Sequence, residues 1–276
     1  MPRTFTPRPR WLSNGTIMAL VEQSLADKTG VLRLNHGDKH NCLNGELMRE
    51  MMAGLDVLVA DGALVIILRA APGVKVWSAG HDINEIPEPR RDPLGYFDAL
   101  ETLLRKIQDC PVPVIAMVEG SVWGGACDLC CSCDIVIAAH GVTFAMTPAK
   151  IGIPYNASGL IHFTNLIGVN KAKEMFFTAQ PVHVDDAWNN GFVNHVVAAE
   201  ELEAFTMKMA ADIAANAPLA VRSIKAEFRL LTRGHHIDAE TAEEIQAIRR
   251  KVYDSEDYAE GIRAFKEKRP PQFQGR

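Results

Sequence analysis

Two glycine-containing loops hold backbone groups that are placed for chemistry. They are residues 77–82 (WSAGHD) and 118–126 (VEGSVWGGA), and each follows an apolar run typical of a buried strand. Glycine permits tight turns there, and the residues after Gly125 predict the start of a helix. The first N–H groups of a helix lack intrahelical partners and carry the positive end of its dipole. If the N–H groups of His81 and Gly125 converge, they form an oxyanion hole for a carbonyl oxygen that becomes negative.

The elements that must position these loops alternate between strands and helices. Apolar runs at 64–68 and 112–118 precede the loops, and residues 134–139 (DIVIAA) predict a further strand. Residues 45–60 carry leucine and methionine at helical spacing and predict an amphipathic helix. This α/β alternation predicts a spiral of repeated ββα turns. Beyond Tyr155 we expect only helices, at 160–167, 171–178, 184–190, 201–215, 218–231, 239–253 and 257–268.

Composition excludes several classes of function. The chain has 276 residues, 47% of them apolar, and a formal net charge of -5, which argues against nucleic acid as a partner. No apolar run approaches the roughly 20 residues of a membrane span. Six cysteines without an even framework favour the reducing cytoplasm over disulfides. Four of them crowd residues 127–133 on one predicted helix, a spacing that disfavours a metal site and favours small buried side chains.

The chain divides into three predicted parts. Residues 1–15 (MPRTFTPRPRWLSNG) are rich in proline and basic residues and predict a flexible arm. Residues 16–205 form the predicted spiral core, which opens with two short strands at 16–23 and 30–35. Residues 206–276 form the predicted C-terminal helical region. Its apolar faces exceed what one sheet layer can cover, so we expect a homotrimer or a dimer of trimers.

The two loops together resemble the crotonase (enoyl-CoA hydratase/isomerase) superfamily, from about residue 16 to the C-terminus. Three further blocks are similar to the acyl-CoA decarboxylases within it: 91–96 (RDPLGY), 144–156 (FAMTPAKIGIPYN) and 252–269 (VYDSEDYAEGIRAFKEKR). The resemblance implies a crotonase-like α/β spiral with a C-terminal helical layer that forms trimers. It also implies an acyl-CoA thioester as substrate, with coenzyme A as part of the substrate and no separate cofactor.

The resemblance also assigns site residues. His81 and Gly125 match the oxyanion-hole positions, while Lys39, Phe265 and Lys268 match positions that contact coenzyme A. The loop that follows His81 shapes the acyl pocket in this superfamily, so Asp82 and Ile83 are expected at the substrate. Ala79, just before the first oxyanion-hole position, is a further expected substrate-binding residue. From the residues alone, a solvated loop lysine is the more common interpretation of Lys39.

The expected reaction depends on two positions at which this chain departs from the hydratases of the superfamily. Those enzymes use two glutamates, whereas this chain has Asp128 and Pro148 there, and proline cannot transfer a proton. We read Asp128 as a surface or buried hydrogen-bonding acid rather than a catalytic one. Loss of CO2 needs mainly a stabilised enolate oxygen, with neutral hydroxyls, here Tyr155 and Thr147, to orient the carboxylate.

The resulting hypothesis is decarboxylation of methylmalonyl-CoA, or of malonyl-CoA, through an enolate. Two alternatives stay open. One is hydration or isomerisation of an enoyl-CoA, and the other is a catalytically inactive oligomer that binds acyl-CoA.

Overall fold

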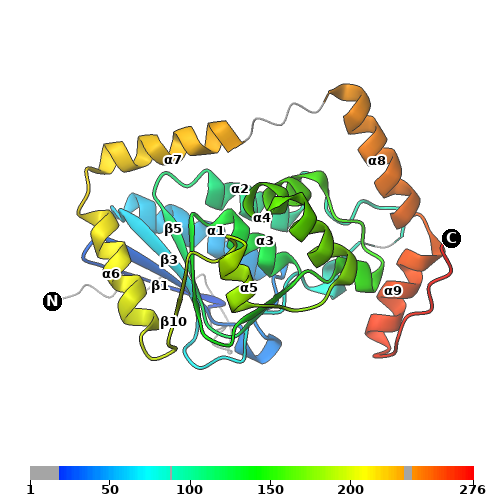
Figure 1. The fold of residues 1–276 in the computed structure, drawn as a ribbon, viewed down its shortest axis with the longest axis horizontal. Helices are drawn as coiled ribbons and strands as arrows, with labels where there is room; N and C mark the ends of the chain where they lie inside the picture. Colours follow the sequence, from blue (N-terminus) through cyan, green and yellow to red (C-terminus); the bar gives the residue numbers. More distant parts are fainter. Residues whose placement is uncertain (1–18, 88, 233–237) are drawn as a thin grey trace, which may run out of the picture.

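The structure of the protein is a computed structural model that describes residues 19–87, 89–232 and 238–276. The predicted N-terminal arm, residues 1–15, lies outside the described residues. Figure 1 shows strands and short helices gathered in a central body, with α7 running along one side and α8 and α9 at one end.

The element bounds are as follows. The strands are β1 (Val21–Ala26), β2 (Thr29–Leu34), β3 (Val65–Ala70), β4 (Val76–Ser78), β5 (Val114–Val118), β6 (Ser121–Trp123), β7 (Ile135–Ala139), β8 (Thr143–Ala145), β9 (Val182–His183) and β10 (His195–Val197). The α-helices are α1 (Gly45–Ala60), α2 (Ala99–Gln108), α3 (Gly125–Ser132), α4 (Ala157–Thr178), α5 (Val184–Asn189), α6 (Leu202–Ala214), α7 (Pro218–Thr232), α8 (Ala239–Tyr253) and α9 (Glu256–Lys266). Short 3-10 helices are η1 (Gly37–Lys39), η2 (Ile83–Glu85) and η3 (Pro148–Ile151).

Two sheets run through the described residues. The larger has the order β1-β2-β3-β5-β7-β10, and the smaller has the order β4-β6-β8-β9. β1 and β2 are antiparallel, whereas β2, β3, β5, β7 and β10 pair in parallel. Each turn of the chain adds one strand to each sheet, first β3 and β4, then β5 and β6, then β7 and β8. The predicted spiral of ββα turns is therefore confirmed.

The large sheet is covered on both faces, which explains its continuous apolar strands. Every residue of β3 and of β5 is buried, as expected for parallel strands between two layers. Leu32 of β2 faces α1, because a side chain on Gly54 of that helix would approach Leu32 Cδ2 to 2.6 Å. Successive side chains of a strand alternate between faces. Arg69 of β3 accordingly points to the other face, where its guanidinium pairs with Glu203 of α6 at 2.8 Å.

The helix predictions hold better than the strand predictions. Helix α1 has the predicted bounds, because Asn44 caps it by accepting a hydrogen bond from the Leu47 N–H. The two helices expected at 160–167 and 171–178 form one span, α4, interrupted at Gly168 by a φ of 75°. The expectation of helices alone beyond Tyr155 is wrong. β9 and β10 lie there, and β10 pairs in parallel with β7 at the edge of the large sheet.

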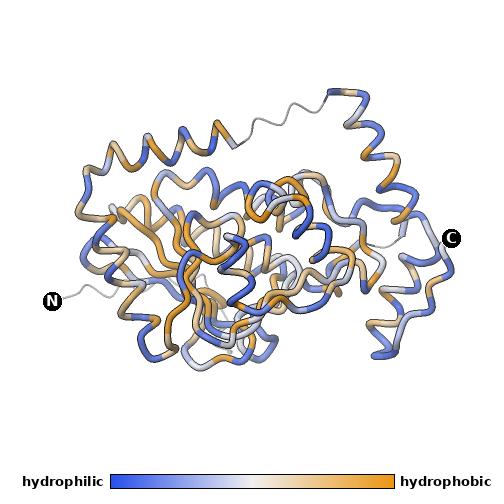
Figure 2. The backbone as a smooth tube through the Cα atoms, viewed as in Figure 1, coloured by the Kyte–Doolittle hydropathy of each residue, from blue (hydrophilic) through white to orange (hydrophobic). Residues whose placement is uncertain are grey.

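The C-terminal helices differ in how they meet the body. Helix α9 packs tightly on η3, since a side chain on Gly261 would approach the Ile151 carbonyl oxygen to 2.2 Å. Helix α7 leaves most of its apolar side chains exposed, and Figure 2 shows hydrophobic positions alternating with hydrophilic ones along it. Helix α9 thus packs on η3, which borders the candidate active site, while α7 has an uncovered apolar face.

Candidate active site

The two glycine loops meet through their backbones. Gly80 has a φ of 81° and Gly124 a φ of 52°, a region that L side chains avoid. A side chain on Gly80 would also lie 2.3 Å from the Trp123 carbonyl oxygen and 3.1 Å from the Gly125 nitrogen. Glycine is therefore required at position 80 both by its dihedral angle and by the closeness of the second loop.

This contact brings together the two expected donors. Gly125 is the first residue of α3, so its N–H has no partner within the helix. The backbone of Leu43 forms hydrogen bonds with the two neighbours of His81. Its N–H donates to the Gly80 oxygen at 2.8 Å, and its oxygen accepts from the Asp82 N–H at 3.1 Å. Among the described residues, neither the His81 N–H nor the Gly125 N–H donates a hydrogen bond to a protein acceptor. Both are thus free to meet a ligand oxygen.

A cavity of about 70 Å³ lies at these donors. Its lining is largely apolar, with Thr147 and Tyr155 as the hydroxyl-bearing residues and Pro148 beside them. The lining residues are Ala79, His81, Ile83, Ile86, Pro93, Leu94, Leu100, Gly124, Gly125, Thr147, Pro148, Ile151, Ile153 and Tyr155. The structure therefore brings six of the predicted site residues to one pocket: Ala79, His81, Ile83, Gly125, Thr147 and Tyr155.

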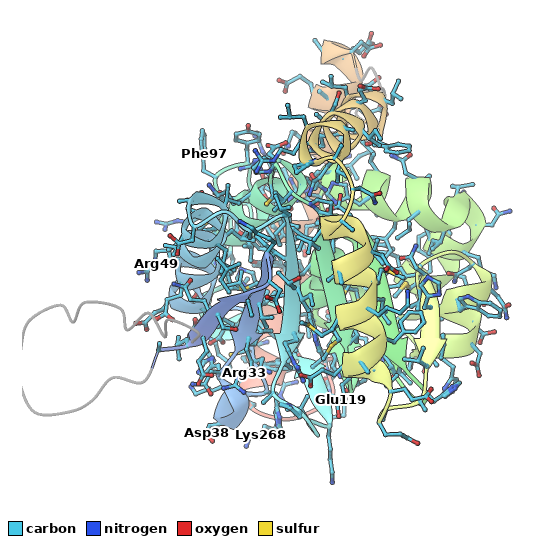
Figure 3. All side chains as sticks on the ribbon, turned by 90° about the vertical axis from the view of Figure 1, so that its left-hand side faces the viewer. Arg33, Asp38, Arg49, Phe97, Glu119 and Lys268 are labelled. Atoms are coloured by element: carbon cyan, nitrogen blue, oxygen red, sulfur yellow. The ribbon has the colours of Figure 1, made fainter. Side chains whose placement is uncertain are left out.

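The other predicted residues lie outside this lining. The Asp82 carboxylate caps η2 by accepting from the Asn84 N–H at 2.9 Å. Lys39 ends the surface helix η1, and Phe265 is 51% exposed on α9. Lys268 is exposed beyond α9, and Figure 3 places it near the same end of the molecule as Asp38, the neighbour of Lys39.

The His81 ring is held by two partners that sequence reasoning did not identify as such. Its Nδ1 lies 3.2 Å from the Asp82 carbonyl oxygen and its Nε2 lies 3.8 Å from Asp98 Oδ1. Burial disfavours the charged ring, but the Asp98 carboxylate outweighs it and raises the pKa of His81 above its ordinary value. At 3.8 Å this is a charge attraction rather than a hydrogen bond. The ring is consequently turned toward Asp98, while the backbone N–H stays available to the pocket.

Behind the pocket, Tyr155 leads into a buried polar chain. The Tyr155 hydroxyl donates to Asp128 Oδ2 at 2.8 Å, and His162 Nδ1 lies 2.8 Å from Asp128 Oδ1. Asp128 is fully buried on α3, which agrees with its reading as a buried hydrogen-bonding acid. Burial, then the charge of Asp128, raises the pKa of Tyr155, so the phenol stays neutral. Sequence reasoning missed His162, because it lies 34 residues from Asp128 and no local motif marks it.

The cysteine cluster packs as small apolar side chains. All six thiols of the chain are free, and burial raises the pKa of Cys127 and Cys130 far above the ordinary range. In residues 19–87, 89–232 and 238–276, no three His, Cys, Asp or Glu side chains are arranged to hold a metal ion. Within the same residues, no helix is long and apolar enough to cross a membrane.

Comparison with known proteins places this geometry in a family. Residues 26–276 match the family model described as enoyl-CoA hydratase/isomerase. The chain belongs to this family. Its resemblance to the crotonase superfamily and its crotonase fold are thereby confirmed.

Individual relatives within the enoyl-CoA hydratase/isomerase family differ in their similarity to this chain. Methylmalonyl-CoA decarboxylase of Escherichia coli K12 is 48% identical, over 90% of this chain and 95% of its own length. Short-chain-enoyl-CoA hydratase of Clostridium acetobutylicum is 31% identical, over 88% and 92%. A solved methylmalonyl-CoA decarboxylase in complex with 2-nitronate-propionyl-CoA superposes with a TM-score of 0.91 at 47% identity, covering 93% of this chain and 99% of that chain.

Proposed function

We propose that this family member is an acyl-CoA decarboxylase that converts methylmalonyl-CoA to propionyl-CoA and CO2. One observation carries the proposal: two unpaired backbone N–H groups, from His81 and Gly125, face an apolar pocket that no carboxylate of the described residues lines. The resemblance to the superfamily puts Pro148, a lining residue, where hydratases carry a glutamate. The relative that is 48% identical is a decarboxylase by name, which supports the same reaction.

The pocket suits loss of CO2. When the bond between the α-carbon and the carboxylate breaks, its electron pair moves into the thioester and makes the carbonyl oxygen negative. Two fixed N–H donors in a dry site stabilise that charge where it develops. No lysine or arginine lines the described pocket, so no cation there stabilises the carboxylate before it leaves as neutral CO2.

Hydration, the first alternative, is less well supported. Adding water to a double bond needs groups that move protons on and off the substrate. Pro148 offers no such group, and the Asp128 carboxylate faces away from the pocket with both oxygens bonded to protein. The second alternative is a catalytically inactive oligomer that binds acyl-CoA. A turnover assay distinguishes it from an enzyme.

The hydroxyls of Tyr155 and Thr147 are the proposed partners of the departing carboxylate. Both line the pocket, and Thr147 Oγ1 lies 3.5 Å from where a side chain on Gly124 would begin. A hydroxyl can orient a carboxylate by a hydrogen bond without adding a full positive charge.

Coenzyme A is the part of the substrate by which we propose that the protein binds it. We assign its contacts to Lys39, Phe265 and Lys268, which are exposed and so accessible to a nucleotide and its phosphates. An ammonium is a suitable point charge for phosphate. Asp82 and Ile83 are assigned to the loop that shapes the acyl pocket. Coenzyme A enters as part of the substrate, and the proposed chemistry calls for no separate cofactor.

The exposed face of α7 supports a homotrimer or a dimer of trimers. Leu219, Phe228 and Leu231 are 80%, 64% and 77% exposed on this helix, an apolar surface that a monomer would leave in water. Light scattering at micromolar protein is expected to give a multiple of three chains, and a monomeric mass would contradict this. The six free thiols fit a reducing compartment, and we propose the cytoplasm.

The function is tested by incubating the protein separately with methylmalonyl-CoA, malonyl-CoA and crotonyl-CoA and following the products by mass. We expect loss of CO2 from methylmalonyl-CoA and little addition of water to crotonyl-CoA. Efficient hydration would favour the first alternative. Binding of all three without turnover would identify a scaffold.

A further inference from the structure

The Tyr155 hydroxyl has a single hydrogen, which poses a problem for its proposed role. In the structure that hydrogen goes to Asp128 Oδ2, 2.8 Å away, so the phenol oxygen presents only lone pairs to the pocket. A lone pair facing a substrate carboxylate repels it. The hydroxyl can point into the pocket only when Asp128 itself carries a proton and donates it to the phenol oxygen.

His162 is placed to supply that proton. Its Nδ1 lies 2.8 Å from the second carboxylate oxygen of Asp128, so a proton arriving at Oδ1 releases one from Oδ2. Its Nε2 lies 2.9 Å from the Gln108 side-chain amide. The Gln108 amide nitrogen donates to Nε2 when the His162 ring is neutral. After a half-turn of the amide group, its oxygen accepts a hydrogen bond from Nε2 when the ring is protonated.

The hydrogen-bonded series Tyr155–Asp128–His162 joins two cavities. Tyr155 lines the 70 Å³ pocket at the oxyanion hole, while Gln108, Ser132 and His162 line a separate cavity of about 460 Å³ between α7 and the body. The His162 side chain keeps 18% of its surface exposed, whereas the Asp128 side chain, which lies between His162 and Tyr155, has none. One end of the chain therefore reaches water and the other reaches the substrate pocket.

Gly159 of α4 packs directly against Tyr155 and Asp128. A side chain on Gly159 would lie 2.1 Å from Tyr155 Cε1 and 2.7 Å from Asp128 Oδ2. Glycine at this position of α4 is what lets the phenol and the carboxylate approach each other.

We propose that His162, Asp128 and Tyr155 form a proton relay that turns the Tyr155 hydroxyl toward the substrate and delivers the proton that replaces CO2. The proposal rests on the proposed function. Decarboxylation of a carboxylate consumes one proton for each CO2 released, so the enzyme needs such a supply. Tyr155 contacts the substrate, and Asp128 and His162 act through it.

Each step of the relay balances. The C–C bond breaks, CO2 leaves, and the electron pair rests on the enolate. The Tyr155 hydroxyl then gives its proton to the α-carbon, and the enolate electrons form the new C–H bond. Asp128 returns a proton to the phenol oxygen, His162 Nδ1 returns one to Asp128, and water in the larger cavity reprotonates His162.

The charges around His162 fit a group that holds a proton. Burial disfavours its charged ring, but the hydrogen bond and charge of Asp128 on α3, with Glu101 on α2, outweigh burial and raise the pKa of His162. Arg229 on α7 opposes this shift weakly. Arg105 and Lys225 line the same larger cavity.

The test uses propionyl-CoA, the product, in D2O, because the relay must also run in reverse. The parent enzyme is expected to exchange the α-hydrogens of propionyl-CoA for deuterium, measured by mass. Abstraction sends a proton outward to the neutral ring, so exchange should rise as pH rises through the pKa of His162. His162→Asn keeps a donor toward Asp128 but cannot ionise. It should exchange about 100-fold more slowly and lose this pH dependence.

The controls separate a relay from a structural role. His183→Asn changes an exposed histidine that makes no capping bond at the start of α5, and it should exchange like the parent. In His162→Asn the KM for methylmalonyl-CoA should change less than about twofold, since the relay does not bind coenzyme A. If that variant does not fold, Asp128→Asn and the pH profile of the parent give the same information.

Failure of the relay and failure of the function look different. A parent enzyme that releases CO2 but exchanges no hydrogen overturns the relay alone, as does His162→Asn with the parent's rate and pH profile. A parent that releases no CO2 overturns the proposed function, while exchange into propionyl-CoA still reports on the relay.

Discussion

Replacing Gly125 by alanine tests the oxyanion hole directly. The first side-chain carbon would lie 2.7 Å from Leu100 Cδ2 and 3.6 Å from the His81 nitrogen. Leu100 and His81 are both walls of the pocket, so the added methyl group projects into the space in front of the two donors. An enolate oxygen must come within about 2.7–3.1 Å of each donor nitrogen, and the methyl group denies it that place.

The magnitude follows from the hydrogen bond that is lost, because the methyl group blocks access to the donor although the N–H itself remains. Removing one oxyanion donor typically costs on the order of 10²–10³ in kcat, or about 2.7–4 kcal/mol of transition-state stabilisation. We therefore expect Gly125→Ala to lower the kcat for CO2 release from methylmalonyl-CoA by at least about 100-fold. KM should change much less, because the remote coenzyme A contacts are untouched.

Overpacking, which would destabilise the fold, is the competing explanation for lost activity in Gly125→Ala. The structure suggests variants that distinguish the two explanations. Leu100 is 1% exposed, so the 2.7 Å approach costs roughly 1–3 kcal/mol of folding stability. The double variant Gly125→Ala with Leu100→Ala removes the overlap, so compared with Leu100→Ala alone it should lose no further thermal stability but should still lose activity. Gly37→Ala, where an added side chain meets nothing within 4 Å, is the matched control. A folded Gly125→Ala enzyme with a kcat within threefold of the parent would refute the assignment of this donor.

Two further substitutions test the remaining roles. Tyr155→Phe keeps the ring and deletes the hydroxyl, so CO2 release should slow by about 10-fold or more at nearly unchanged KM, because a hydrogen bond to a charged group is worth roughly 1.5–3 kcal/mol; an unchanged rate in steady-state assays would return Tyr155 to a packing role. Lys268→Ala should raise the KM for methylmalonyl-CoA and leave kcat nearly constant, since a distant charge contact binds ground and transition states equally. Lys171→Ala, an exposed lysine on α4 paired with Glu174, should change neither constant.

Local signals accounted for much of the fold. Helix α1 was predictable to the residue because its cap and its apolar stripe are both local features. The break at Gly168 was also predictable, because the sequence pattern already separates the helices expected at 160–167 and 171–178. Strands β9 and β10 were not, because each has three residues or fewer and too little alternation to reveal a period. What makes β10 a strand is its partner β7, which lies far back in the chain.

The candidate site divides in the same way. Gly80, His81 and Gly125 could be found from the sequence, because the resemblance to the crotonase superfamily rests on the two loops that carry them. The glycine spacing alone would more often mark a tight turn. Asp98 beside His81, and His162 behind Asp128, could not be found, because side chains from separate helices meet only after the spiral has closed. The contacts of Lys39 and Lys268 with coenzyme A stay predictions.

In the proposed mechanism, loss of CO2 differs from addition of water in where the site allows protons. At position 148 a proline ring fills the wall of the pocket, which removes a direct acid. At position 128 the acid is one methylene shorter than glutamate and is held behind Tyr155 by His162. No carboxylate lines the described pocket to activate water, while the proposed relay gives the single proton that decarboxylation consumes a route through Tyr155. In this proposal Asp128, at the position where the resemblance places one hydratase acid, points away from the pocket and toward His162.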